Sequence, residues 1–192
     1  MEGIEHAEEE ENLGISLLDP LCEDLNECEK LLEQSDTQFV RRAFVRAAFA
    51  FNEGYVYWLR EHVQQWLVEK GWQAGHLEVS KVCLLTDEIV EPNSVGQVVS
   101  RPGRTPFLND CAFVIRTGAE CWDLDPGPFF SDYGWCEMQT ALRVRHRITH
   151  PKHPEELVVA AGEVESVRRA HRWLFSCLEE ILSKAETVSR VE

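Results

Sequence analysis

The sequence lacks the features of a secreted or membrane-spanning protein. Its N-terminus is acidic and has no basic segment followed by an apolar run, so no secretory signal is predicted. The most apolar stretch, residues 43–59, is interrupted by Arg46, Asn52 and Glu53, which argues against a membrane span. None of the seven cysteines forms a C-x-x-C pair, and we interpret them as reduced core thiols. Together these absences predict a cytoplasmic protein.

Signals for strands and repeats are also missing. No segment alternates strongly between apolar and polar residues, and no internal repeat is found. The chain of 192 residues is long enough for one domain with a substantial core. Residues 1–12 carry many glutamates and little to bury, so they are predicted to form a disordered acidic tail. We assign residues 13–186 to a single helical domain.

Apolar residues at helical spacing predict an all-α fold. A first helix is expected to begin at Asp19 and Pro20, and a long second helix to run from about Thr37 to Lys70, closed by Gly71. The segment 92–105 is interpreted as a linker. This pattern is typical of an antiparallel bundle of about five or six helices. The remaining helices are expected over 77–88, 105–116, 133–150 and 161–184.

Two charged residues occur where the second helix is apolar on nearly every side. Such a helix lies centrally in a fold, where an unpaired charge is costly. Arg46 and Glu53 are two turns apart on one face, too far for contact with each other. Each is therefore expected to meet an opposite charge from another element, or to lie at an exposed edge of the helix.

No carboxylate occurs between Met138 and Pro154, although the chain carries a formal net charge of -15. That bulk charge disfavours non-specific binding to nucleic acid, because the summed field repels phosphates. A local cationic patch on such a protein nevertheless indicates contact with phosphates. The interval contains Arg143, Arg145, His146, Arg147, His150, Lys152 and His153.

Projection onto a helix separates the arginines of this interval into three environments. Arg145 lies within an apolar arc and needs a strong acceptor, for which Glu53 or a second protomer is the natural source. Arg147 points further outward and, like Lys152, is expected to be solvated. The accessible flank consists of Arg143, His146 and His150.

His150 is expected to end this helix, because Pro151 disfavours helical geometry in the residue before it. A histidine placed there among cations can accept or deliver a proton near neutral pH. A metal site is an alternative, since His146 and His150 are one turn apart, a spacing that suits a transition metal. The neighbouring arginines would repel a cation, so we predict no metal and no other cofactor.

The sequence RHRITH over residues 145–150 resembles the R-x4-H signature of the HEPN superfamily (higher eukaryotes and prokaryotes nucleotide-binding). That signature lies at the end of a helix and has a polar residue directly after the arginine; here that residue is His146. Arg143 also fits the looser R-x6-H form, so the motif arginine stays open between Arg143 and Arg145. The aromatic second helix with Glu53 is similar to the family's first core helix, and the resemblance covers about residues 37–184.

The resemblance implies a helical-bundle homodimer whose two motifs face each other in a cleft. It also implies a metal-independent endoribonuclease of toxin–antitoxin, defence or RNA-processing systems. The RNA 2′-hydroxyl would attack the adjacent phosphate, with His150 moving the proton and Arg145 neutralising the phosphorane. The expected supporting residues are Arg143, His146 and Glu53, and the expected RNA-binding residues are Arg147 and Lys152.

A second function is left open. HEPN domains also occur as non-catalytic modules, and the acidic tail and net charge fit a helical module that dimerises or binds a nucleotide or a protein. In one branch of the family a tyrosine follows the histidine by two residues, where this chain has Lys152. Control through that tyrosine is therefore not expected, although the toxin interpretation still implies an antitoxin protein as a partner.

Overall fold

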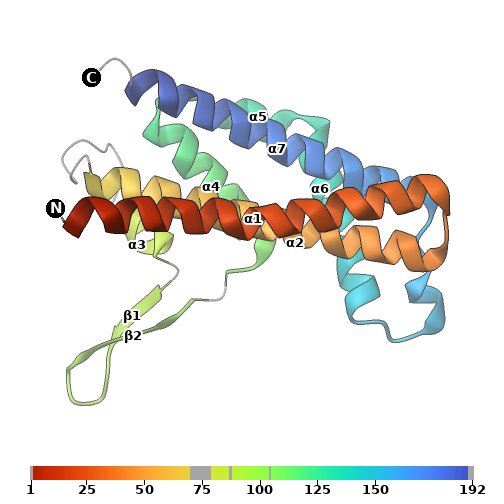
Figure 1. Cartoon of the computed structure of the whole chain (residues 1–192). Helices are drawn as coiled ribbons and strands as arrows, with labels where there is room; N and C mark the ends of the chain where they lie inside the picture. Colours follow the sequence, from red (N-terminus) through yellow and green to blue (C-terminus); the bar gives the residue numbers. More distant parts are fainter. Residues whose placement is uncertain (1, 70–78, 87, 104, 190–192) are drawn as a thin grey trace. The chain divides into compact units, whose positions relative to one another are not determined.

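The computed structural model describes residues 2–69, 79–86, 88–103 and 105–189 (Figure 1). The predominantly helical character predicted from the sequence is confirmed in these ranges, and none of their helices is long and apolar enough to cross a membrane. In chain order the elements are α1 (Glu2–Gln34), α2 (Gln38–Glu69), α3 (Val79–Leu85), β1 (Glu88–Pro92), β2 (Val98–Pro102), α4 (Phe107–Cys121), α5 (Gly127–Ser131), α6 (Tyr133–Thr149), the 3-10 helix η1 (Pro154–Leu157) and α7 (Ala161–Ser189).

The chain divides into two compact units. Unit 1 comprises Met1–Tyr55 and Phe129–Ser176, and unit 2 comprises Val56–Pro128 and Cys177–Glu192. Helices α2 and α7 therefore each contribute their first part to unit 1 and their last part to unit 2. The assignment of residues 13–186 to one domain stays a prediction.

Unit 1 is a helical bundle in which α2 and α6 run antiparallel. Arg46 of α2 lies against the Ile148 carbonyl near the end of α6, and Glu53, two turns later in α2, lies against the earlier residue Arg145. The order of contacts is thus reversed between the two helices. Fully buried side chains of both helices form the core here, namely Phe44, Val45, Ala48, Phe49, Met138, Ala141 and Ile148.

Helix α7 joins the other helices of unit 1 through polar and aromatic contacts. Arg168 donates from Nε and Nη2 to the carboxylate of Glu29 in α1, at 2.9 and 2.6 Å. Tyr55 of α2 packs against Phe175 with ring centroids 5.7 Å apart. Helix α7 therefore contacts both α1 and α2 in unit 1.

A buried polar contact links α2 and α7 inside unit 1. His171 Nδ1 lies 2.9 Å from Asn52 Oδ1, and the ring packs edge-on against Phe51. Burial lowers the pKa of His171 below its ordinary value, opposed by Glu29 and supported by Arg172. The folded state therefore holds His171 neutral where the unfolded chain would protonate it.

We predict that this histidine makes unit 1 less stable in mild acid. Because the unfolded state binds the extra proton, the free energy of unfolding rises with pH and falls below about pH 6.5, by at most about 1.4 kcal/mol per pH unit. His171→Gln keeps a polar partner for Asn52 but cannot titrate, so its stability should change less between pH 7 and pH 5. Urea unfolding of both proteins at the two pH values measures the difference. Parallel losses in the two proteins would contradict the assignment to His171.

Unit 2 is built around a charged pair and close helix contacts. Arg60 of α2 is 4% exposed and is paired with Asp110 in the first turn of α4. A Cβ added at Gly118 of α4 would touch Val63 of α2 and Ile181 of α7, both at 3.5 Å. Helices α2, α4 and α7 therefore pack closely in this unit, with the Arg60 charge neutralised inside it.

The cysteines are only partly the core thiols that the sequence predicts. All seven are free; Cys111 and Cys177 are buried, and burial raises the pKa of the Cys111 thiol well above its ordinary value. Cys22, Cys83 and Cys136 are exposed, so the prediction is wrong for these three.

The linker predicted over 92–105 is instead largely an antiparallel hairpin. β1 pairs with β2 in a register that places Val90 opposite Ser100 (Figure 1). The turn is built by Asn93, whose Oδ1 accepts hydrogen bonds from the backbone of Val95 and Gln97, both at 3.0 Å. Proline and glycine in this segment therefore mark the ends and the turn of a hairpin and not an open linker.

Several helix boundaries also differ from the prediction. α1 begins at Glu2 and contains Pro20, so the segment assigned to a disordered tail is drawn as helix and the proline does not start it. A proline costs one backbone hydrogen bond there, but its fixed φ angle is compatible with a helix. α4 is preceded by Pro106 without a side-chain cap and extends to Cys121. Lys70, Gly71 and Leu77, the predicted ends of two helices, lie outside the described residues.

Candidate functional site

The predicted helix around the cationic interval is confirmed, and both of its ends are where the sequence places them. Asp132 caps α6 by accepting a hydrogen bond from the Tyr133 backbone at 2.6 Å. The helix ends at Thr149, and His150 follows it with φ -126° and ψ 55°. The His150 backbone N–H still donates to the His146 carbonyl at 3.0 Å. The two imidazoles are therefore one turn apart at the end of α6, and both are exposed.

The accessible flank predicted by projection is also confirmed. Arg143, His146 and His150 are all exposed. Arg143 Nη2 donates to the Thr140 hydroxyl one turn earlier at 2.9 Å, and within the described part of the chain it has no ion pair. Because residues four and seven apart share a helix face, the three side chains form one row along α6.

Arg145 pairs with Glu53, as the apolar arc requires. Its Nη2 donates to Glu53 Oε1 at 3.0 Å, and the two side chains are 29% and 41% exposed. A pair this open contributes little to stability, on the order of 1 kcal/mol or less. Its main consequence is geometric, since the carboxylate fixes the guanidinium at the solvent boundary between α2 and α6.

Arg46 meets a helix end instead of a carboxylate. Its Nη2 lies 3.5 Å from the Ile148 carbonyl oxygen, and the side chain is exposed. The last carbonyls of a helix carry partial negative charge, so a cation is favourable there. Arg46 therefore lies at an exposed edge of α2, and it adds a positive charge to the end of α6 that the local sequence of α6 does not reveal.

The predicted solvation of Arg147 is wrong. Its Nη2 donates to the Val158 carbonyl at 2.9 Å and to Glu163 Oε2 at 2.8 Å. Glu163 also accepts the Ala160 backbone N–H at 2.9 Å and so caps the start of α7. The projection fails here because the chain folds back after α6 and covers this side of the helix. Arg147 is thus a structural link between α6 and α7.

Lys152 remains at the surface, as predicted. Its backbone N–H donates to Glu156 Oε2 at 2.6 Å. This hydrogen bond and a second one from the His153 backbone N–H hold the pKa of Glu156 below its ordinary value. The carboxylate of Glu156 is therefore turned toward the backbone of the loop, which shapes the segment that displays the Lys152 side chain.

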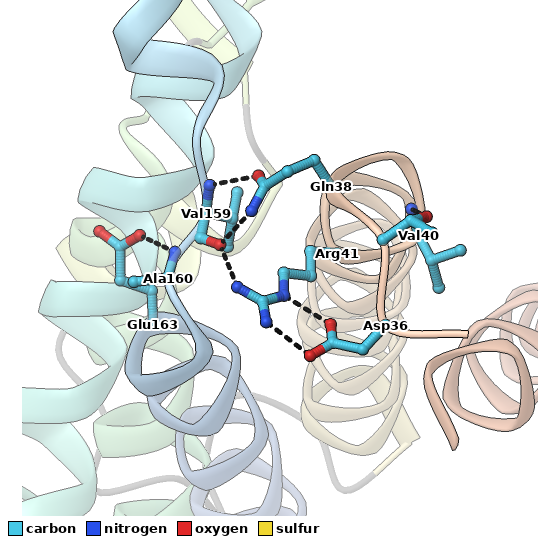
Figure 2. Close-up of polar contacts among 8 residues, drawn as sticks. Asp36, Gln38, Val40, Arg41, Val159, Ala160 and Glu163 are labelled. Carbon is cyan, nitrogen blue, oxygen red and sulfur yellow. Dashed lines mark hydrogen bonds and ion pairs between the residues drawn. The ribbon is translucent and has the colours of Figure 1, made fainter. Parts of the chain in front are cut away.

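The segment between α6 and α7 is clamped to the first turns of α2. Gln38 Nε2 donates to the Val159 carbonyl at 3.0 Å, and the Val159 N–H donates to Gln38 Oε1 at 2.8 Å (Figure 2). Arg41 Nη1 donates to the same carbonyl at 2.8 Å, while its other nitrogens bind Asp36. The hydrogen bonds from Arg41 lower the pKa of Asp36 and keep it charged.

A further arginine extends this clamp. Arg42 Nη1 donates to the Leu157 carbonyl at 3.1 Å. The residues 38–42 therefore hold the returning segment at Leu157 and Val159, a contact that sequence reasoning missed. The only signal for it is the pair of arginines at the start of α2, whose partners are backbone carbonyls and leave no trace in the sequence.

These contacts leave a group of cationic and imidazole side chains around the end of α6, which we call the α6-end cluster. Three carboxylates near it, Glu53, Glu163 and Glu156, are engaged by Arg145, by Arg147 and by the loop backbone, respectively. Across the described ranges no group of three or more histidine, cysteine, aspartate or glutamate side chains is placed to hold a metal ion. The cluster consists of Arg46, Arg143, Arg145, His146, His150 and Lys152.

Comparison of the chain with protein-family models, with curated proteins and with solved structures finds no match. The function is therefore inferred from the chemistry of the α6-end cluster and from the resemblance of the six-residue motif.

Proposed function

We propose that this protein is a metal-independent endoribonuclease of the HEPN type, acting at the α6-end cluster. One observation carries the proposal: two exposed imidazoles lie in a row with Arg143 at the end of α6, on a chain whose net charge is -15. Arginine supplies a fixed positive charge and imidazole supplies a proton-transfer group, the combination that phosphate-ester cleavage uses.

The chemistry follows from groups that RNA itself supplies. The 2′-oxygen forms a bond to the adjacent phosphorus, and the bond from phosphorus to the 5′-oxygen breaks, leaving a 2′,3′-cyclic phosphate and a 5′-hydroxyl. One imidazole accepts the proton of the 2′-hydroxyl, and a protonated imidazole delivers a proton to the leaving oxygen. We assign His150 to this proton transfer, with His146 one turn away as its support.

Arg145 is assigned to the charge of the phosphorane. Glu53 binds its Nη2, so the guanidinium is positioned before RNA arrives, and an arginine fork can then donate to phosphate oxygens from its other nitrogens. On a regular helix Arg145 and His150 diverge by ~140°. We therefore include in the proposal a homodimer in which the two α6 ends face each other and each arginine serves the partner's histidine. The antitoxin partner stays a prediction.

An RNA-cleavage experiment in EDTA distinguishes the proposed role of Arg145 from that of Arg143. Arg145→Ala should lower the cleavage rate by about 100-fold or more, as removal of one preorganised charge donor does. Arg143→Ala should lower it less, because among the described residues the Arg143 guanidinium binds the Thr140 hydroxyl and no carboxylate. Glu53→Gln should fall between the wild-type protein and Arg145→Ala.

The matched control is Arg172→Ala, which removes a 68% exposed arginine of α7. It should retain wild-type cleavage. A larger loss in Arg143→Ala than in Arg145→Ala would transfer the motif role to Arg143. RNA binding without any cleavage would favour the non-catalytic module instead.

A further inference from the structure

Phe39 is an exposed aromatic residue in the first turn of α2. It is 70% exposed, the most open aromatic side chain among the exposed large hydrophobic residues of the described chain. Burying a phenylalanine side chain is worth roughly 1.5–3 kcal/mol, so this exposure forgoes stability. Its backbone lies in a capped helical turn, because the Thr37 hydroxyl accepts the Val40 backbone N–H at 3.3 Å.

The position of Phe39 places it beside the α6-end cluster. Arg46 is seven residues later in α2, so the two side chains share a face and are separated by ~10 Å along the axis. Arg46 lies 3.5 Å from the Ile148 carbonyl, at the end of α6 that displays His150. Phe39 therefore lies on the same face of α2 as an arginine of the α6-end cluster, about 10 Å from it along the helix axis.

Arginines flank Phe39 on α2, and the carboxylate nearest to it in the sequence is paired. Arg42 is three residues away on α2, with its Nη1 on the Leu157 carbonyl at 3.1 Å. The nearest carboxylate in the sequence, Asp36, is bound by Arg41 through two bonds of 2.5 Å. An aromatic face flanked by Arg42 and Arg46 combines a stacking surface with cations that can bind phosphate. Proteins that bind single-stranded nucleic acids use this arrangement.

We propose that Phe39 is the stacking platform for an unpaired base of RNA whose backbone lies on Arg42, Arg46 and the α6-end cluster. The inference rests on the proposed function for its ligand, single-stranded RNA, and adds a requirement that cleavage alone does not impose. A base inside a duplex is stacked on its neighbours and does not reach an outside ring. The site therefore prefers single strands to duplexes.

The test is a binding measurement with RNA that cannot be cleaved. A fluorescent 2′-O-methyl RNA of about 12 nucleotides, single-stranded or annealed to its complement, is titrated with the full chain in EDTA and followed by anisotropy. Phe39→Ala should weaken binding of the single strand by about 5- to 100-fold and change duplex binding by less than about 2-fold. Phe39→Trp should retain the wild-type affinity.

The control is Tyr133→Ala, which removes a 66% exposed aromatic side chain at the start of α6, ~25 Å along that helix from His150. It should bind both RNAs like the wild-type protein. Equal affinity of Phe39→Ala and wild-type protein for the single strand, equal weakening toward both RNAs, or no RNA binding at all would overturn the inference. So would a change in oligomeric state by size-exclusion chromatography, because Phe39 would then be a contact to a second copy. Binding that depends on Phe39 without cleavage of ordinary RNA would sink the proposed enzyme but not this site.

Discussion

Replacing His150 by alanine should lower the rate of RNA cleavage by about 100- to 10,000-fold. The imidazole is exposed at the end of α6, where the backbone N–H of the same residue still bonds to the His146 carbonyl. The substitution therefore removes the proposed proton-transfer group and leaves the helix end intact. The loss should fall on kcat, since the arginines proposed to bind phosphate remain, and single-turnover cleavage of a labelled RNA measures it.

His153→Ala provides the comparison for this result. His153 is three residues further along the chain and is also exposed. It directly precedes η1 and has an extended backbone, with φ -137° and ψ 151°. It carries no role in the proposed reaction, so its variant should cleave RNA at nearly the wild-type rate. Equal losses in His150→Ala and His153→Ala would show that general positive charge, and not a proton-transfer group, supports the activity.

Replacing Gly134 by alanine should destabilise the protein by about 2–4 kcal/mol and lower its Tm by roughly 5–15 °C. A Cβ at this position would overlap the Cβ and indole ring of Trp173 in α7. The indole does not swing away freely, because its Nε1 donates to the Phe129 carbonyl at 3.0 Å and its ring packs on Phe130 and Trp135. The close approach of α6 and α7 thus requires glycine at position 134, because any Cβ there would overlap Trp173.

Gly162→Ala is the matched substitution. Gly162 is the second residue of α7, as Gly134 is of α6, but a Cβ there would meet nothing within 4 Å. Alanine favours a helix over glycine by up to about 1 kcal/mol, so this variant should be as stable as the wild-type protein or slightly more stable. Thermal unfolding of both variants decides the point, and a stable Gly134→Ala protein would contradict the described packing of α6 on α7.

The parts of the site that depend on local sequence could be predicted. Asp132 and Pro151 mark the two ends of α6 through capping and through the steric restriction before proline. The spacing of apolar residues placed Arg145 within a buried arc, and the need for a carboxylate there pointed to Glu53, the acid embedded in the apolar part of α2. These inferences succeed because each rests on one helix and one physical requirement.

The parts that depend on the path of the returning chain could not be predicted. Arg147 is covered by the segment after α6, and Gln38 and Arg41 bind backbone groups of Val159. Backbone carbonyls are present at every residue, so such partners give no pattern in a sequence. The hairpin was missed for a different reason: its strands are short, and the turn at Asn93 has the composition of an ordinary loop.

The central claim is that the end of α6 cleaves RNA by using the 2′-hydroxyl of the RNA itself. It is tested most directly by incubating the protein in EDTA with two oligonucleotides that differ only in a single 2′-deoxy substitution at a mapped cleavage site. We expect the all-ribose strand to be cut there, leaving a 2′,3′-cyclic phosphate, and the substituted strand to stay intact at that position. Cleavage of both strands at that site, or cleavage of the all-ribose strand that is unchanged in His150→Ala, would contradict the account.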